Sequence, residues 1–284
     1  MGRLVVFLVA TIWVACGCAL AQGEEGRLKR IGDTGTVKLA YRSDANPFSF
    51  VNAKGQPDGY TVDLCKFVVQ SLERQLNARL AITWVAVDTQ NRIETVASGA
   101  ADMECGSTTV SIARMAKVDF SSFIFMENTG LVVRASSKIF SVGDLGGKTI
   151  AVIAGTTNEA ALVKELQRRQ LQTSLVRVKD RREGMAGLES GAFDGFASDK
   201  LLLIGALTAD ASAYKMLPEN LSYEPYAIVL PRGDWAFRLA VNKGLSQLYS
   251  SQQILEIYLK WFAAIGERPD LLRAAVYIFG TFPD

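Results

Sequence analysis

The chain has 284 residues, 49% of them apolar, and carries 31 Lys and Arg against 29 Asp and Glu, with no His. The absence of His excludes Ser-His and Cys-His nucleophilic pairs and His-ligated metal sites, so binding is favoured over catalysis. Charges of both signs are interspersed without a basic stripe, which argues against nucleic acid as a partner.

The N-terminus has the pattern of a secretory signal. Arg3 is followed by an apolar stretch over residues 4–20, and small residues lead to Ala21 in an A-x-A arrangement. We therefore expect a signal peptide over residues 1–21 and export to the periplasm. A membrane anchor is the alternative, but the run is short for a span and ends in the cleavage pattern. Lipidation at Cys18 is a third option, although the expected Leu three residues upstream is missing.

Cys65 and Cys105 are then the two cysteines of the exported chain. One interpretation is a disulfide, which an oxidising compartment permits, and the other is a pair of small buried thiols. A bridge that closes a loop of about 40 residues stabilises a fold by roughly 4 kcal/mol in the chain-entropy model. The sequence does not choose between the two.

Short β-branched runs alternate with longer amphipathic runs from residue 36 onward, a pattern typical of βαβ units and a parallel sheet. The first group predicts strands at 36–42, 80–87 and 101–106, and helices at 61–76 and 91–99. The second group predicts strands at 148–155, 174–180 and 195–199, with helices from the turn after 155, at 184–191 and at 200–207. The sequence therefore predicts two α/β lobes.

Two extended segments, 120–134 and 223–233, connect these lobes, and the helical residues 235–262 return to the first one. We expect lobe 1 to comprise residues 30–125 and 226–284, and lobe 2 residues 126–225. The apolar tail, 271–283, either packs on lobe 1 or forms an exposed interaction helix. Ligands of open α/β sheets bind beyond the carboxyl ends of the strands, so the facing lobes predict a cleft.

Polar side chains lie at the predicted strand ends. An arginine fork donates two parallel hydrogen bonds to a carboxylate, and hydroxyls and a helix start add further donors. Taken singly, each residue is more simply explained as a solvated arginine or a helix cap, whereas their joint occurrence at successive strand ends favours a binding cleft. The candidates are Arg42, Thr89, Arg92, Ser107, Thr109, Arg114, Thr157, Arg181 and Asp199.

Several long motifs occur in order from about residue 30 to about residue 262. They include PFSF, DGYTVDLC, TQNRI, SGAADMECGSTT, DLGGKTIAVIAGTTNEAAL, LESGAFDGFASD and LKWF. In these motifs the chain resembles the periplasmic solute-binding proteins of ABC amino-acid importers, in particular the glutamate/aspartate-binding group. The resemblance implies a type II periplasmic binding protein clamshell that closes on one L-glutamate or L-aspartate and delivers it to a membrane permease. It also implies a monomer without cofactors.

The resemblance assigns the residues that bind the α-amino acid group. It implies that Arg114 holds the α-carboxylate, helped by Thr109 and by Thr157. It also implies that Ser107 and Asp199 take the α-ammonium, with Asp199 as the counter-charge.

The same resemblance places Arg42, Thr89 and Arg92 against the side-chain carboxylate of the ligand. The sequence departs from the group after Lys179-Asp180, where dicarboxylate binders typically carry His and this chain has Arg181. An inward-pointing Arg181 would add a third guanidinium, which either favours a carboxylate further or reduces the space.

Two alternative functions remain. One is a broader binder of Glu, Gln, Asp and Asn, because the amide oxygen of Gln still accepts from an arginine. The other is a periplasmic enzyme resembling cyclohexadienyl dehydratase, which needs a carboxylic acid in the cleft. The candidate acids are Glu104, Glu159 and Asp199, but an ammonium partner explains Asp199 better and helix capping explains Glu159 better.

Overall fold

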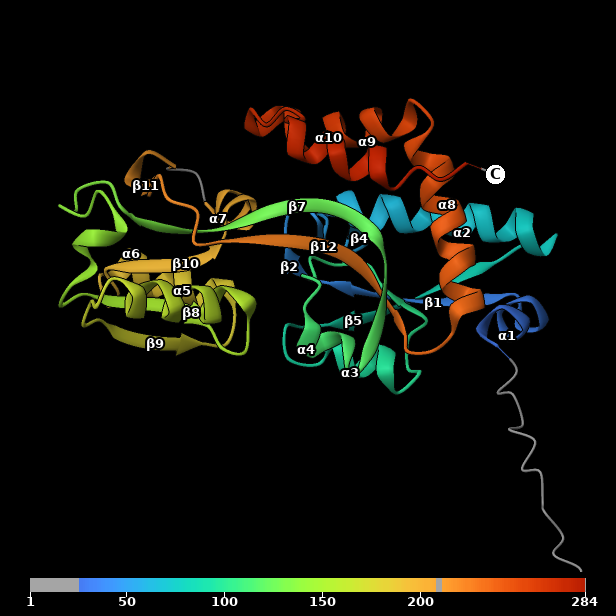
Figure 1. Cartoon of the computed structure of the whole chain (residues 1–284), viewed down its shortest axis with the longest axis horizontal. Coiled ribbons are helices and arrows are strands. Elements are labelled where there is room, and N and C mark those ends of the chain that lie inside the picture. Colours follow the sequence, from blue (N-terminus) through green and yellow to red (C-terminus); the bar gives the residue numbers. More distant parts are fainter. Residues whose placement is uncertain (1–25, 208–210, 284) are drawn as a thin grey trace, which may run out of the picture.

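The computed structural model describes residues 26–207 and 211–283 (Figure 1). The predicted signal peptide, residues 1–21, lies outside these ranges. Within them, no helix combines the length and the apolar character that a membrane crossing requires.

Ten α-helices and twelve strands make up the described part of the chain. The helices are α1 (Arg27–Thr34), α2 (Tyr60–Leu76), α3 (Arg92–Ala97), α4 (Ile112–Met115), α5 (Thr157–Arg168), α6 (Arg181–Ser190), α7 (Lys200–Ala206), α8 (Trp235–Tyr249), α9 (Gln253–Phe262) and α10 (Leu271–Phe279). The strands are β1 (Thr36–Arg42), β2 (Asp44–Ala45), β3 (Ser49–Val51), β4 (Pro57–Asp58), β5 (Ala81–Val87), β6 (Met103–Glu104), β7 (Val118–Arg134), β8 (Thr149–Ile153), β9 (Ser174–Val178), β10 (Gly195–Asp199), β11 (Tyr214–Met216) and β12 (Ser222–Pro231).

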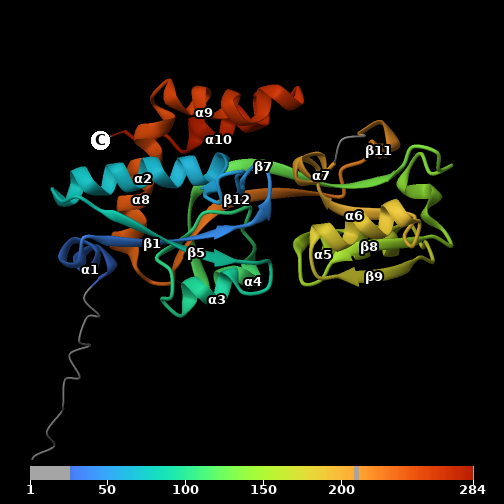
Figure 2. The same cartoon turned by 180° about the vertical axis from the view of Figure 1, so that it is seen from behind.

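One continuous sheet runs through both lobes in the order β5-β1-β6-β12-β7-β10-β8-β9, and β11 pairs with β7. The strands β5, β1 and β6 are mutually parallel in lobe 1, as are β9, β8 and β10 in lobe 2. Between them, β7 and β12 form a long antiparallel ribbon that passes from one lobe to the other (Figures 1 and 2). The predicted pair of α/β lobes with two crossover strands is thus present. The exact lobe limits, 30–125 with 226–284 and 126–225, stay a prediction.

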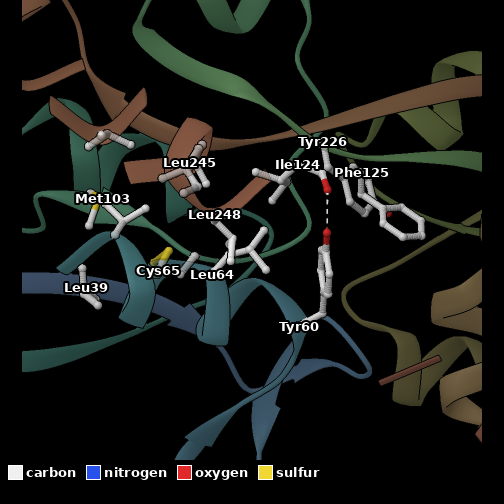
Figure 3. Packing of buried hydrophobic residues seen from close by; sticks show 14 of the residues in the cluster. Leu39, Tyr60, Leu64, Cys65, Met103, Ile124, Phe125, Tyr226, Leu245 and Leu248 are labelled. Carbon is white, nitrogen blue, oxygen red and sulfur yellow. Dashed lines mark hydrogen bonds between the residues drawn. A yellow bond between two sulfur atoms is a disulfide. The ribbon is translucent and has the colours of Figure 1, made fainter. Parts of the chain in front are cut away.

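The core of lobe 1 is rich in aromatic rings. Phe48 lies 4.9 Å from Phe125, 5.1 Å from Tyr226 and 5.5 Å from Phe262, measured between ring centroids. The Tyr60 hydroxyl donates to the Ile124 carbonyl at 2.8 Å, which satisfies its polar end inside the core (Figure 3). Burying each such ring stabilises the fold by about 1.5–3 kcal/mol, and this core anchors the lobe-1 end of the crossover ribbon.

Cys65 and Cys105 are joined by a disulfide, which answers the question that the sequence left open. Cys65 lies on α2, and Cys105 directly precedes Gly106 and Ser107. The bridge therefore fixes the segment that carries Ser107 to the packed helix α2.

The structure moves some predicted boundaries. Helix α6 begins at Arg181 rather than at residue 184, because the Asp180 side chain caps it by accepting from the Glu183 amide at 2.9 Å. The strand expected over 101–106 is reduced to Met103–Glu104. The tail forms α10, which packs on β7 and α8 of lobe 1 and buries Arg273.

Candidate ligand-binding site

A small cavity of about 10 Å³ lies between the lobes, where the carboxyl ends of the parallel strands meet. This space holds about one water molecule, so the lobes must move apart before an amino acid can enter. Eight of the nine predicted site residues line it: Arg42, Thr89, Arg92, Ser107, Thr109, Thr157, Arg181 and Asp199. The sequence analysis missed four further lining residues, Ile153, Thr156, Asn158 and Leu202.

Arg114, the ninth predicted residue, lies just beside this lining. Its Nη1 donates to the Thr109 carbonyl at 2.7 Å from the short helix α4. Burial lowers the pKa of Arg114, while the negative charges of Glu224 and Glu104 act in the opposite direction. The guanidinium is thus held at the edge of the cavity, against a residue that lines it.

Three arginine side chains are buried in the cavity wall. Arg42, Arg92 and Arg181 are only 2%, 4% and 5% exposed. Burial lowers the pKa of Arg92 to about 9, and the charges of Arg42 and Arg114 add to this effect. The side chain stays charged at neutral pH, but its charged form is destabilised, as expected for cations that face one another without an anion between them.

Asp44 connects two of these arginines. Its Oδ1 accepts from Arg42 Nε at 2.9 Å and lies 2.6 Å from Arg42 Nη2. Arg181 Nη1, from the other lobe, donates to the Asp44 carbonyl at 2.7 Å and lies 3.5 Å from its Oδ2. Burial alone raises the pKa of Asp44, but the charges of Arg42 and Arg181 outweigh burial and hold it below its usual value. The Asp44 carboxylate is therefore ionised at neutral pH.

Glu224, on the crossover strand β12, collects hydroxyl donors from both lobes. Its Oε2 accepts from Thr109 at 2.7 Å and from Thr157 at 2.6 Å. Its Oε1 accepts from Thr129 at 3.0 Å and from Ser222 at 2.5 Å. In this arrangement Thr109 and Thr157 donate their hydroxyl protons to Glu224, so their oxygens can act toward a further group only as acceptors.

Asp199 ends β10 and is 5% exposed. Asn158 holds it by donating to Oδ1 at 2.8 Å, while the same amide nitrogen also lies 2.7 Å from Thr129 Oγ1. Burial raises the pKa of Asp199 to about 6, and the negative charge of Glu224 adds to the shift, whereas Arg181 opposes it. A buried carboxylate with a raised pKa is a suitable partner for a cation such as an ammonium.

The other two candidate acids differ in their surroundings. Glu159 accepts from the Gly155 amide at 2.8 Å, and its own amide donates to Thr156 Oγ1 at 3.2 Å, which confirms the capping interpretation. Glu104 is fully buried, and neither carboxylate oxygen has a hydrogen-bond partner among the described residues. A Cβ at Gly106 would lie 2.0 Å from Glu104 Oε1, so a larger residue there would displace the buried Glu104 side chain.

The two lobes touch each other around the cavity. Gln90 Nε2 donates to the Ala154 carbonyl at 2.9 Å, and Asn46 Nδ2 donates to the Gly205 carbonyl at 3.3 Å. Together with the contact between Arg181 and Asp44, these bonds join lobe 1 to lobe 2 at separate points. The structure therefore shows a closed arrangement of the lobes.

Residues 37–264 match the family of bacterial extracellular solute-binding proteins, family 3. The chain belongs to this family. The fold is accordingly the type II periplasmic binding protein fold that the sequence predicts. Within the described residues, no group of three or more His, Cys, Asp or Glu side chains is arranged to hold a metal ion.

Several named proteins of family 3 are similar to this chain. An L-glutamate/L-aspartate-binding protein of Pseudomonas aeruginosa is 36% identical over 246 residues, which cover 84% of this chain and 80% of the relative. A glutamate/aspartate import solute-binding protein of Escherichia coli is 27% identical over 262 residues, covering 89% and 87%. These relatives are solute-binding proteins and not enzymes.

A solved structure extends the comparison. An ancestral amino-acid-binding protein, described as a precursor of cyclohexadienyl dehydratase, superposes with a TM-score of 0.71 at 26% identity, covering 84% of this chain and 99% of that protein. This neighbour is itself an amino-acid-binding protein, so the comparison does not favour the enzyme alternative.

Proposed function

We propose that this protein is the extracytoplasmic amino-acid-binding component of an ABC importer and that it binds L-glutamate or L-aspartate by closure of its two lobes. The observation that carries the proposal is the cavity itself, where three buried arginines from both lobes face a small space that also contains Asp199. Buried cations are costly, Asp44 offsets only part of their charge, and a ligand with two carboxylates and one ammonium balances the rest. The names of the similar glutamate/aspartate-binding proteins support it.

The α-amino acid group would be held by one set of residues. We assign the ammonium to Asp199 and to the oxygens of Ser107, Thr109 and Thr157. The last two are available as acceptors because their protons are donated to Glu224. The α-carboxylate then falls to Arg114, and the N-terminus of the 12-residue helix α5 adds its positive dipole end. The family resemblance implies that these two threonines help to hold the α-carboxylate, whereas in this proposal their hydroxyl oxygens accept from the ammonium.

The side chain of the ligand would be selected by Arg42, Thr89, Arg92 and Arg181. An aliphatic side chain in this space leaves the guanidinium groups without partners, which disfavours Leu or Val by about a thousandfold or more. We further propose that the protein acts as a monomer in the periplasm and delivers its ligand to a membrane permease. A broader range that includes Gln and Asn is the second candidate, because Asp44 already offsets part of the positive charge.

Calorimetric titration of the purified protein with Glu, Asp, Gln, Asn, Leu and Lys tests the proposal. We expect binding of Glu or Asp and no measurable binding of Leu. Arg114→Ala should abolish binding of every amino acid, whereas Arg92→Ala should mainly remove the preference for acidic ligands. Arg79→Ala, which removes an exposed arginine outside the cavity, is the matched control and should bind as the wild type does. Tighter binding of Leu than of Glu, or wild-type affinity in both site variants, would contradict the assignment.

A further inference from the structure

Among residues 26–207 and 211–283, Asp44 is the carboxylate that forms ion pairs with arginines of the cavity wall. It lies two residues after the end of β1 and contacts Arg42 from its own lobe and Arg181 from the opposite lobe. The Arg42 side chain is 2% exposed and that of Arg181 is 6% exposed, but that of Asp44 is 31% exposed, so solvent screens these pairs only in part. The negative charge of Asp44 therefore acts directly on the part of the cavity assigned to the ligand side chain.

Asp44 leaves most arginine donors free. Arg42 directs Nε and Nη2 to Asp44 Oδ1. A guanidinium has five N–H groups, so others remain for another acceptor. Arg181 uses Nη1 for the Asp44 carbonyl, while its buried Nε has no hydrogen-bond partner in the described chain. A ligand oxygen that enters when the lobes move apart can thus still accept from both guanidinium groups. The main effect of Asp44 on a ligand is electrostatic and not a blockage of donors.

The charge of the ligand side chain decides how strongly it senses Asp44. A carboxylate is repelled by the Asp44 carboxylate behind the two arginines, whereas a neutral amide is almost unaffected and still offers an oxygen to the free N–H groups. Arg181 adds one positive charge to the cavity, and Asp44 offsets one. The two residues thus leave the net charge close to that of a cavity with neither.

We propose that Asp44 is a specificity-determining residue that reduces the preference of this site for acidic over amide side chains, so that the affinities for the two kinds of ligand become more similar. The inference rests on the proposed function, because it concerns the ligand range of the same cavity. It deepens that function by giving this chain a defined ligand class, amino acids with a terminal carboxylate or amide. In this class the choice between Glu and Gln, or between Asp and Asn, is set by the balance of Asp44 and Arg181.

The variant Asp44→Asn removes the charge and keeps the shape. The backbone carbonyl that accepts from Arg181 is unchanged, and the Asn oxygen can still accept from Arg42. At an effective dielectric constant of about 20, one unit charge a few ångströms from an anion changes its binding by roughly tenfold or more. We therefore expect the ratio of the Kd for Gln to the Kd for Glu to rise about tenfold in Asp44→Asn, mostly through tighter binding of Glu.

Titration calorimetry with Glu, Gln, Asp and Asn measures this ratio. Asp33→Asn, which removes an exposed carboxylate remote from the cavity, is the control for overall charge and should keep the wild-type ratio. Asp44→Ser is a second neutral variant and should raise the ratio in the same direction, so a folding defect of one substitution does not decide the result. An unchanged or lower ratio in the folded neutral variants overturns the proposal. If the wild type binds none of the four ligands, the proposed function fails instead.

Discussion

The protonation of Asp199 should make ligand binding depend on pH. Burial and the charge of Glu224 raise the pKa of this carboxyl to about 6 in the unliganded cavity. A bound ammonium favours the ionised form, so the pKa falls in the complex and binding releases a proton from the protonated fraction. At low pH a proton neutralises the Asp199 carboxylate, and the ammonium of the ligand must displace this proton in order to bind. Affinity should therefore decrease as the pH falls below about 6.

The size of the effect can be calculated from the pKa. At about pH 5 roughly ten of eleven molecules carry the proton, whereas at about pH 7.5 almost none do, so the Kd should be about tenfold higher at the lower pH. The ligand side chain, with a pKa of about 4.3 for Glu, stays mostly ionised over this range. Titration calorimetry at the two pH values measures the Kd, and buffers of different ionisation enthalpy report the released proton.

Two variants separate Asp199 from its surroundings. Asp199→Asn should bind more weakly at about pH 7.5 and lose the pH dependence below it, because it has no titrating group. Glu127→Gln makes the neighbouring buried carboxyl permanently neutral and should retain the tenfold change. A wild-type Kd that is the same at both pH values, or an Asp199→Asn variant that keeps the full dependence, would refute this reasoning.

Two further predictions concern stability. Burial raises the pKa of Glu127 to about 8, with a contribution from the charge of Asp199, so the folded state holds a proton that the unfolded chain loses near pH 4.5. Stability should fall by up to about 5 kcal/mol as the pH rises from about 4.5 to 8, and urea unfolding of Glu127→Gln should not show this loss. If the free energies of unfolding of the wild type and the variant change in parallel with pH, Glu127 is not the cause. Replacing Cys65 and Cys105 together by Ala should lower the free energy of unfolding by about 4 kcal/mol and weaken ligand binding. Unfolding curves that coincide with those of the oxidised wild type would show that the bridge does not contribute.

Much of the site could be predicted from the sequence because parallel strands place their carboxyl ends at one edge of a sheet. Arg42, Thr89, Thr157, Arg181 and Asp199 follow or end strands that the hydrophobic pattern identifies, and all of them line the cavity. This prediction required neither the order of the strands in the sheet nor the burial of each side chain. The fold thus converts a regular position along the chain into proximity in space.

The residues that the sequence analysis missed depend on contacts between distant segments. Asp44 meets Arg181 across 137 positions, and Glu224 meets Thr109 across 115. Asp44 lies in a turn-rich stretch where an acidic residue is ordinary, and Glu224 lies in an extended segment where strand alternation gives no reason for a buried charge. The position of Glu224 in a largely apolar crossover strand is the feature of the sequence that indicates a buried carboxylate. It does not indicate which residues contact that carboxylate.

The crossover ribbon has a mechanical consequence for how the lobes separate. Its strands β7 and β12 are paired with each other from Val118 to Thr129, and register shifts interrupt the pairing around Ala227, near the middle of this stretch. A bulge at such a place bends and twists a ribbon without dissolving its ladder. Opening at this point would swing lobe 2 as one piece and would move Thr157 and Glu224 together away from Thr109. The register shift and the Glu224 carboxylate, which accepts from threonines of both lobes, therefore lie three residues apart on one strand, so a substitution that changes the bend also moves this carboxylate.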